Sequence, residues 1–227
     1  MKRIVQPEFL DELPSSDPRA IRSRRDLRRI NAWMGNYSIM ARALQSNLNG
    51  HTPKQITELG AGDGTFLLRV AQKIAARWPD VNATLLDQKE NVSPQTLAAF
   101  DSLGWHAEAV VADVFDWPQT ECEIVIANLF LHHFEDAKLK ELLQIIAQRA
   151  QLFIVLEPHR FRFPFPCAQL LRFIGCSKIT LHDAEASIAG GFIRQEISAL
   201  WRDKQNWQIT ERRAGLFSHL FIARKIV

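Results

Sequence analysis

The spacing of hydrophobic positions changes near residue 55 and divides the chain into two parts. Before that point, apolar residues recur at helical spacing. One such stretch follows Asp17-Pro18, which places the proline in the first turn of a helix. A second runs over Trp33–Leu44 and stops before Asn49-Gly50, a suitable C-cap. These patterns predict an N-terminal helical extension over residues 1–50, with a possible role as a lid.

From Gln55 onward, short apolar runs alternate with helical stretches, a pattern typical of βαβ units and a parallel sheet. The predicted strands are Gln55–Leu59, Ala83–Leu86, Ala107–Ala112, Cys122–Asn128 and Leu152–Glu157. The predicted intervening helices are Thr65–Arg77, Ser93–Leu103 and Asp136–Ala150. We therefore expect one α/β domain over residues 51–227.

The last third of the chain is less regular. The segment 158–166 contains too many prolines for a helix or strand and predicts a loop. Short helices are expected at Gln169–Ile174 and Ile193–Leu200. The apolar runs Trp207–Arg212 and Leu216–Ala223 flank Ala214-Gly215 and predict an antiparallel hairpin.

Length and composition suit one globular domain with additions. The chain has 227 residues, 47% of them hydrophobic, and carries a net charge of +3. Such a weak charge does not call for nucleic acid. No apolar run approaches the roughly 18 residues that span a bilayer, and the N-terminus does not resemble a signal peptide, so we expect a cytoplasmic protein. Three cysteines without a CxxC pair indicate neither a disulfide framework nor a zinc site.

A glycine-rich turn joins the first predicted strand to the first predicted helix of the α/β part. It reads Glu58-Leu59-Gly60-Ala61-Gly62-Asp63-Gly64. Glycine permits positive φ and lets a ligand approach the backbone closely. The spacing is GxGxG, whereas a dinucleotide fingerprint reads GxGxxG. Glu58 would repel a pyrophosphate and attract an ammonium or sulfonium, so the turn favours a cationic ligand.

Two further acidic residues follow the next two predicted strands, where an open α/β sheet places its ligand crevice. Asp87 comes after Thr84-Leu85-Leu86, and its carboxylate can accept both hydroxyls of a ribose. Asp113 comes after Val110-Val111-Ala112 and can accept a hydrogen bond from an exocyclic amine such as that of adenine.

Together these segments resemble the class I S-adenosylmethionine (SAM)-dependent methyltransferases. The run Ile126-Ala127-Asn128-Leu129-Phe130-Leu131-His132-His133-Phe134 is similar to the fourth-strand motif of small-molecule members such as the ubiquinone and menaquinone methyltransferases. The resemblance implies a Rossmann-like three-layer sandwich with a mostly parallel seven-stranded sheet whose last strand is antiparallel. It also implies SAM as the cofactor.

The resemblance assigns cofactor roles to residues at the ends of the strands. Gly60 and Gly62 would face the methionine part of SAM, Asp87 the ribose, and Asp113 with the Val114 backbone the adenine. The full expected set is Glu58, Gly60, Ala61, Gly62, Asp87, Gln88, Asp113, Val114 and Asn128.

Two adjacent histidines are the candidates for the chemical step. His132 and His133 follow the fourth strand at the ligand edge of the sheet, and one of them could remove a proton from a phenol or enol acceptor. We favour His133, although both could instead shape the pocket or cap a helix. In His182-Asp183, the aspartate could orient the imidazole, although we expect it to cap the helix that follows. No histidine or cysteine spacing matches a metal site, so no metal is predicted.

Aromatic residues in Trp33–Tyr37 and Phe161–Pro166 could cover the crevice or fill the core. If they cover it, the acceptor is apolar or aromatic. We therefore expect methylation, at oxygen or carbon, of a small phenolic, quinone or polyketide-like acceptor. An arginine-rich stretch over residues 19–29 leaves open a nucleic-acid or protein methyltransferase, although nucleic acid is the less expected partner. A non-catalytic SAM-binding subunit is a third possibility. The acceptor and the oligomeric state are not disclosed by the sequence.

Overall fold

Seven strands form one mixed sheet in a computed structural model that describes residues 2–48, 50–117, 121–161, 171 and 175–226. The strand order is β3-β2-β1-β4-β5-β7-β6. The strands are β1 (Gln55–Leu59), β2 (Val81–Asp87), β3 (Trp105–Val111), β4 (Cys122–Asn128), β5 (Ala150–Pro158), β6 (Trp207–Ala214) and β7 (Ser218–Lys225). The five strands predicted within the βαβ part are confirmed, and β1 and β4 have the predicted bounds.

The strand directions confirm the expected fold class. The pairs from β3 through β5 are parallel, while β7 is antiparallel to both of its neighbours. The final hairpin, β6 and β7, turns at Gly215, whose φ is +66°. Nearly all residues of β1, β4 and β5 are buried, as expected for central strands covered on both faces.

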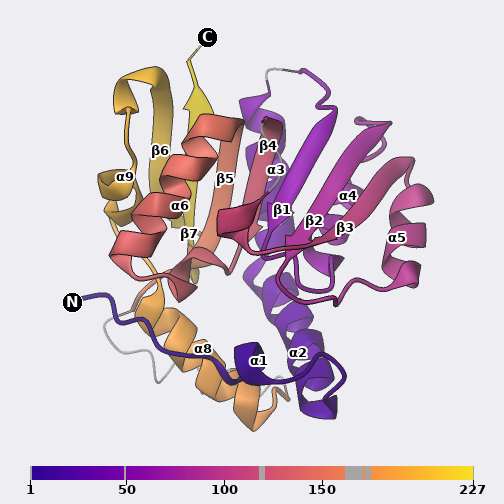
Figure 1. Cartoon of the computed structure of the whole chain (residues 1–227), viewed down its shortest axis with the longest axis vertical. Coiled ribbons are helices and arrows are strands. Elements are labelled where there is room, and N and C mark those ends of the chain that lie inside the picture. Colours follow the sequence, from indigo (N-terminus) through magenta and orange to yellow (C-terminus); the bar gives the residue numbers. More distant parts are fainter. Residues whose placement is uncertain (1, 49, 118–120, 162–170, 172–174, 227) are drawn as a thin grey trace.

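Helices cover both faces of the sheet and make the three layers visible in Figure 1. One face packs against α3 (Asn36–Asn47), α4 (Thr65–Ile74) and α5 (Pro94–Asp101). The other packs against α6 (Asp136–Arg149) and α9 (Glu196–Leu200). Each helix buries one apolar side, so the protein has two hydrophobic cores separated by the sheet. The Rossmann-like three-layer sandwich is confirmed.

A third group of helices lies at the carboxyl ends of the strands, at the bottom of Figure 1. It consists of α1 (Phe9–Glu12), α2 (Pro18–Met34) and α8 (Lys178–Gly190). The short 3₁₀ helices are η1 (Val114–Asp116), η2 (Leu131–His133) and η3 (Lys204–Asn206). The two predicted N-terminal helices correspond to α2 and α3. We did not predict α1 or the full length of α8.

The expected role of Asp183 as the cap of a following helix is wrong. Ser177 caps α8, because its hydroxyl accepts from the Thr180 backbone N–H at 3.2 Å. Asp183 lies within α8 and instead accepts from the backbone N–H groups of Phe9 and Leu10, at 3.0 and 3.1 Å. It therefore caps α1, which is distant in sequence.

The link between α2 and α8 is a buried polar contact. Asp26 on α2 accepts from the Ser177 backbone N–H at 2.8 Å and from the Thr180 hydroxyl at 3.0 Å. The predicted helix Gln169–Ile174 lies almost entirely outside the described residues. The one predicted at Ile193–Leu200 is the shorter α9. Across the ranges that the structure describes, no helix is long and apolar enough to cross a membrane.

Candidate functional site

A cavity of about 380 Å³ lies at the carboxyl ends of β1, β2 and β4 and is covered by the helices of the N-terminal region. Its floor contains Glu58, the glycine-rich turn and Asp87, and its roof contains residues of α1 and α2. The position is the one expected for ligands of open α/β sheets. Its volume is within the range of small-ligand pockets.

The glycine-rich turn has a conformation that other residues adopt only with strain. Gly60, Gly62 and Gly64 have φ values of +66°, +56° and +73°. A Cβ at Gly60 would lie 2.3 Å from the Phe130 ring, so close packing excludes a side chain there. A Cβ at Gly62 would meet nothing within 4 Å. Gly62 therefore leaves open space beside the backbone, where a ligand can approach.

Asp87 holds the glycine-rich turn against the end of β2. One carboxylate oxygen accepts from the Gly62 backbone N–H at 2.8 Å, and the other accepts from the Lys89 backbone N–H at 2.8 Å. Gln88 donates to Asp113 at 2.9 Å, and Asp113 also caps η1. Gln88 and Val114 line the cavity. Asp113 is not one of the lining residues and is hydrogen-bonded to one of them, Gln88.

Glu58 is a buried acid that faces the cavity. Its side chain belongs to a residue only 2% exposed, and its Oε2 has no hydrogen-bond partner among the described residues. Burial raises the pKa of this carboxyl group well above its usual value, and the charges of Asp63 and Asp87 add to the effect. An acidic group at the cavity wall with one oxygen unpartnered among the described residues is suited to a ligand that brings a positive charge and N–H donors.

Asn128 belongs to a buried cluster of amide side chains. Asn36 donates to Asn31 at 2.9 Å and to Asn128 at 3.3 Å, and Asn128 donates to Asn31 at 3.1 Å. The Ser218 hydroxyl donates to Asn36 at 2.6 Å. The cluster ties α2 and α3 to β4 and β7. Asn128 and Asn31 line the cavity, and we did not predict Asn31 as a site residue.

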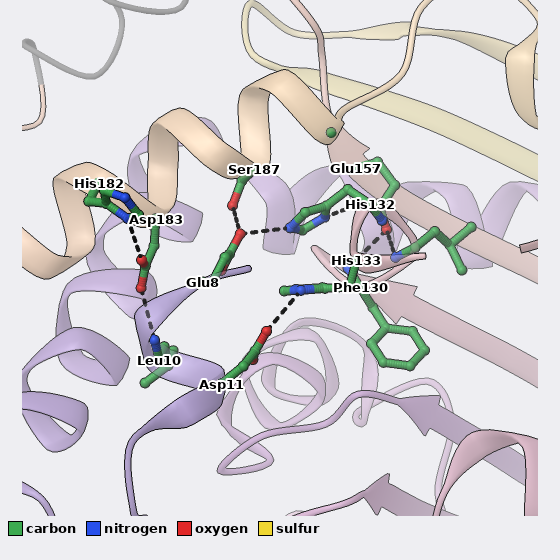
Figure 2. A network of polar contacts seen from close by, with 12 residues as sticks. Glu8, Leu10, Asp11, Phe130, His132, His133, Glu157, His182, Asp183 and Ser187 are labelled. Carbon is green, nitrogen blue, oxygen red and sulfur yellow. Dashed lines mark hydrogen bonds and ion pairs between the residues drawn. The ribbon is translucent and has the colours of Figure 1, made fainter. Parts of the chain in front are cut away.

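His132 lies between two buried carboxyl groups, as Figure 2 shows. Its Nδ1 is 2.7 Å from Glu157 and its Nε2 is 3.2 Å from Glu8. Burial alone would lower the pKa of His132, but the hydrogen bonds to Glu157 and Glu8 outweigh burial and raise the pKa to about 10. With both ring nitrogens engaged and the ring protonated near neutral pH, His132 is poorly suited to accept a proton.

His133 differs from its neighbour in exposure and in partners. Its side chain is 25% exposed, lines the cavity and has Nδ1 3.1 Å from the Asp11 carboxylate. The two histidine rings lie 4.2 Å apart, centroid to centroid. A carboxylate on one ring nitrogen is the arrangement that orients a histidine for proton transfer. Geometry therefore favours His133 over His132 for that role.

We call residues 8–13, which include α1 and form one part of the cavity roof, the lid. Glu8 accepts from the Ser187 hydroxyl of α8 and contacts His132. Lys89 donates to the backbone carbonyls of Leu10, Asp11 and Leu13 at 3.1, 2.6 and 3.1 Å. The lid residues Glu8 and Asp11 were missed in the sequence, because their partners are far away in the chain. Ser177-Lys178-Ile179-Thr180 carries an N-cap signal that would have located α8.

A smaller apolar cleft of about 80 Å³ adjoins the cavity between α2, α8 and the end of β5. Glu8, Leu10 and Ser187 are common to both. Aromatic side chains at the cleft include Trp33 and Phe217, whose rings stack at 4.5 Å. Of the aromatic stretches expected to cover the site, Trp33 and Phe161 line this cleft, and residues 162–166 lie outside the described part.

Comparison with protein-family models identifies the class. Residues 56–151 match the model of a family described as a methyltransferase domain. This match identifies residues 56–151 as part of a SAM-dependent methyltransferase domain, and the sheet order is that of its fold. No curated protein matches the sequence.

Solved structures with the same fold are distant in sequence. The plantazolicin methyltransferase, solved with a triazolic desmethylPZN analogue and S-adenosylhomocysteine (SAH), has a TM-score of 0.64 at 11% identity, covering 95% of this chain and 92% of that one. Magnesium protoporphyrin IX methyltransferase from Synechocystis, with bound SAM, has a TM-score of 0.56 at 11% identity, covering 98% and 86%. An O-methyltransferase family protein from Burkholderia thailandensis has a TM-score of 0.55 at 18% identity, covering 88% and 61%. Against several such neighbours the chain spans little more than half of their length.

Proposed function

We propose that this protein transfers a methyl group from SAM to a small organic acceptor. The observation that carries the proposal is the junction of two hollows of different character. The larger hollow, the cavity, contains the unpartnered Oε2 of Glu58 and open space beside the Gly62 backbone. Both features suit the polar, cationic cofactor. The smaller is apolar and aromatic, which suits an uncharged acceptor. Glu8, Leu10 and Ser187 lie where the two meet.

The proposed cofactor contacts follow the ends of the strands. Glu58, Gly60, Ala61 and Gly62 would hold the methionine part, with Glu58 accepting from the ammonium group. Asp87 would accept from the ribose hydroxyls, and Gln88, Asp113 and Val114 would surround the adenine. Asn128 would face the sulfonium region beside Asn31. In this assignment, Asp87 keeps its hydrogen bond from Gly62 and so couples the cofactor to the turn.

For the acceptor, we propose a phenolic, quinone or polyketide-like molecule methylated at oxygen or carbon, as in the ubiquinone and menaquinone type. The acceptor hydroxyl gives its proton to His133, its oxygen or the conjugated carbon attacks the methyl carbon, and the carbon–sulfur bond breaks with its electron pair left on sulfur. Asp11 orients the imidazole. Alignment of the two reactants in a dry site supplies the rest of the acceleration.

We further propose that residues 51–227 form the methyltransferase domain and residues 1–50 an extension that covers its site. The arginines of α2 support a role in this cover more than a nucleic-acid surface. Arg19 pairs with Asp17, Arg24 donates to the Ser15 carbonyl, and Arg28 pairs with Asp63 of the glycine-rich turn at 2.5 Å. These guanidinium groups are thus directed to partners within the chain.

The test is methyl transfer from isotopically labelled SAM to a panel of phenols, quinols and enolic polyketide analogues. We expect label in at least one acceptor class. His133→Ala should slow single-turnover transfer by about 10²–10⁴-fold if the imidazole is the base. SAM affinity should be unchanged. His51→Ala, which removes an exposed histidine paired with Glu123, is the matched control.

A transfer rate unchanged in His133→Ala would refute the base role and leave alignment as the source of catalysis. Binding of SAM without transfer to any class in the panel would contradict the small-acceptor proposal. Transfer to an oligonucleotide or a protein in place of the panel would do the same.

A further inference from the structure

Three potential metal ligands converge at the inner surface of the lid. Glu8 precedes α1, while His132 and His133 form the end of η2. One donor atom from each lies within 4.8 Å of the other two. Within the described ranges, no other group of three or more histidine, cysteine or acidic side chains comes together in this way. All three side chains line the cavity, so an ion held there would be open to a ligand.

The distances are those of a nearly formed tetrahedral site. His132 Nε2 and Glu8 Oε1 lie 3.2 Å apart. Bonds of 2.0–2.2 Å from a tetrahedral Zn²⁺ to nitrogen and oxygen put two such donors about 3.3 Å apart. One ring nitrogen of His133 lies within 4.8 Å of these two donors. Two of the three residues are buried and positioned by packing.

Each of the three side chains also has an outer partner that fixes its orientation. Glu157 accepts at His132 Nδ1 at 2.7 Å, Asp11 contacts the His133 ring at 3.1 Å, and Ser187 donates to Glu8. Figure 2 shows these partners arranged around the three side chains. Metal-binding histidines almost always have a carboxylate, carbonyl or water on the second ring nitrogen. The surrounding carboxylates also concentrate the negative charge that a divalent cation compensates.

We propose that Glu8, His132 and His133 bind one divalent transition-metal ion, with a fourth coordination position open to the cavity. Two imidazoles and one carboxylate suit Zn²⁺ or a similar ion, whereas Mg²⁺ and Ca²⁺ prefer oxygen ligands throughout. Sequence spacing predicted no metal, because Glu8 is 124 residues from His132. The site places the open position beside the apolar cleft, since Glu8 borders both hollows.

The role of the ion rests on the proposed function, although the site itself does not. A hydroxyl of the acceptor would occupy the open position and release its proton to water. Its oxygen would then attack the methyl carbon of SAM as the carbon–sulfur bond breaks, with the electron pair left on sulfur and SAH as the second product. The ion would displace the proton that His132 carries near neutral pH, and it would occupy a ring nitrogen of His133, so His133 acts either as a ligand or as the base. Transfer that persists in chelator-treated enzyme would therefore support His133 as a base, and transfer lost with the metal and restored by it would support the ion.

The site is tested on untagged full-length protein freed of metal with a chelator. Zn²⁺ binding is measured by calorimetry, and Co²⁺ binding by its visible absorption, which reports the number and kind of ligands. We expect one equivalent of either ion, with binding at least 100-fold weaker in Glu8→Gln and His133→Gln. Asp11→Asn should weaken binding about 10–100-fold through the His133 ring. His51→Gln, which removes an exposed histidine paired with Glu123, is the matched control and should bind like wild type.

Circular dichroism confirms that each variant is folded before titration. If Glu8→Gln fails to fold, Asp11→Asn and His133→Gln carry the test. Zn²⁺ affinity of wild-type protein no tighter than that of His133→Gln overturns the site. So does stoichiometric binding that survives all three substitutions, and so does a Co²⁺ spectrum without nitrogen ligands. SAM binding measured in parallel shows whether the proposed function stands when the metal site does not.

Discussion

The floor and the lid of the cavity are held by different kinds of interaction. Backbone hydrogen bonds hold most of the floor. Strands β1 and β2 pair in register, and the Ala61 N–H donates to the Leu86 carbonyl at 3.0 Å. The lid is held by side chains from distant segments, with Glu8 at His132 and Asp183 at the start of α1. Glu8 and His132 are 124 residues apart in the sequence, and Phe9 and Asp183 are 174 residues apart.

This difference implies that the two sides respond differently to change. A four-residue helix such as α1 cannot form alone, because nucleation costs more than one turn returns. It is ordered by its side-chain partners, so single substitutions among them should loosen it. The floor is supported by a continuous backbone ladder between strands, to which the Asp87 side chain adds its contact with Gly62. We expect lid changes to affect local order and acceptor chemistry, and floor changes to affect cofactor affinity.

The largest effect is expected where the two sides meet, at Glu157. Its carboxyl group accepts from the backbone N–H groups of Phe130 and Leu131 at 3.0 and 2.7 Å, and from the His132 ring. Glu157→Ala leaves these buried donors without an acceptor and should cost about 3–5 kcal/mol in the free energy of unfolding. Urea denaturation at neutral pH measures it.

Glu157→Gln is the matched variant, because the amide oxygen can still accept and the shape is kept. It should cost less than the alanine substitution. A loss below about 1 kcal/mol in Glu157→Ala would mean that water replaces the carboxyl group, and that Glu157 does not join the floor to the lid.

The floor was predictable from the sequence because its signals are local. The glycines of the turn, Glu58 before them and Asp87 after the next strand are each read from a few neighbouring residues. Strand β5 and the final hairpin were also predicted. Parallel pairing then brings these ends to one edge of the sheet, as a general rule of such folds. The specific partners of Asp87 and the amide cluster around Asn128 required the structure.

The contacts that hold the lid in place could not be predicted from the sequence, for physical reasons. Nothing in the sequence near Glu8 shows that its partner is His132, since that contact depends on how α8 docks. Apolar and polar residues of α8 are not clearly separated onto two sides of the helix, because the lid covers one part of it and α2 another. Asp183 looked like a cap for its own helix, and it caps α1 instead. His132 and His133 were found as a pair, but their different surroundings come from Glu157 and Asp11.

The next effect in size concerns the floor alone. Asp87→Ala should weaken SAM binding by about 1.5–3 kcal/mol, because it removes the proposed bonds to the ribose and the acceptor for the Gly62 N–H. Calorimetry with SAM and SAH measures the change. Asp101→Ala, at the exposed end of α5, is the control. Unchanged affinity in Asp87→Ala would contradict the assignment of the ribose to this carboxylate.

A smaller effect is expected at the clamp between floor and lid. Lys89→Met keeps the length of the side chain but removes the donor to three lid carbonyls. Amide hydrogen exchange in residues 8–13 should become faster, corresponding to a loss of about 1–2 kcal/mol in local stability. Global unfolding should hardly move. Lys138→Met, which breaks an exposed pair with Glu141, should leave lid exchange at the wild-type rate. Equal exchange in both variants would show that Lys89 does not hold the lid.

The smallest expected effect is a pH dependence on the acceptor side, beside the apolar cleft. His159 directly follows β5, and its ring lies 5.3 Å from that of Phe161. Its Nδ1 has no hydrogen-bond partner among the described residues. Burial lowers the pKa of His159 to about 4, and the nearby positive charge of Arg213 adds to the effect. The unfolded chain has a histidine pKa of about 6.5, so between pH 6.5 and 4 the unfolded state binds more protons. The stability that depends on a neutral His159 is therefore complete above about pH 6.5 and is lost as the pH falls toward 4.

His159→Gln removes this titration while keeping a polar side chain of similar size. Relative to wild type, the variant should be more stable at pH 4.5 than at pH 8, by a difference of about 1 kcal/mol or less, because water reaches part of the ring and screens the effect. Urea midpoints of both proteins at the two pH values measure the difference, and subtraction cancels the titration of the carboxylates. His106→Gln, at an exposed ring on β3, controls for the loss of any histidine and should show no such difference. If wild type and His159→Gln lose stability in parallel on acidification, the pKa of His159 is the same in the folded and unfolded chains, and burial does not lower it.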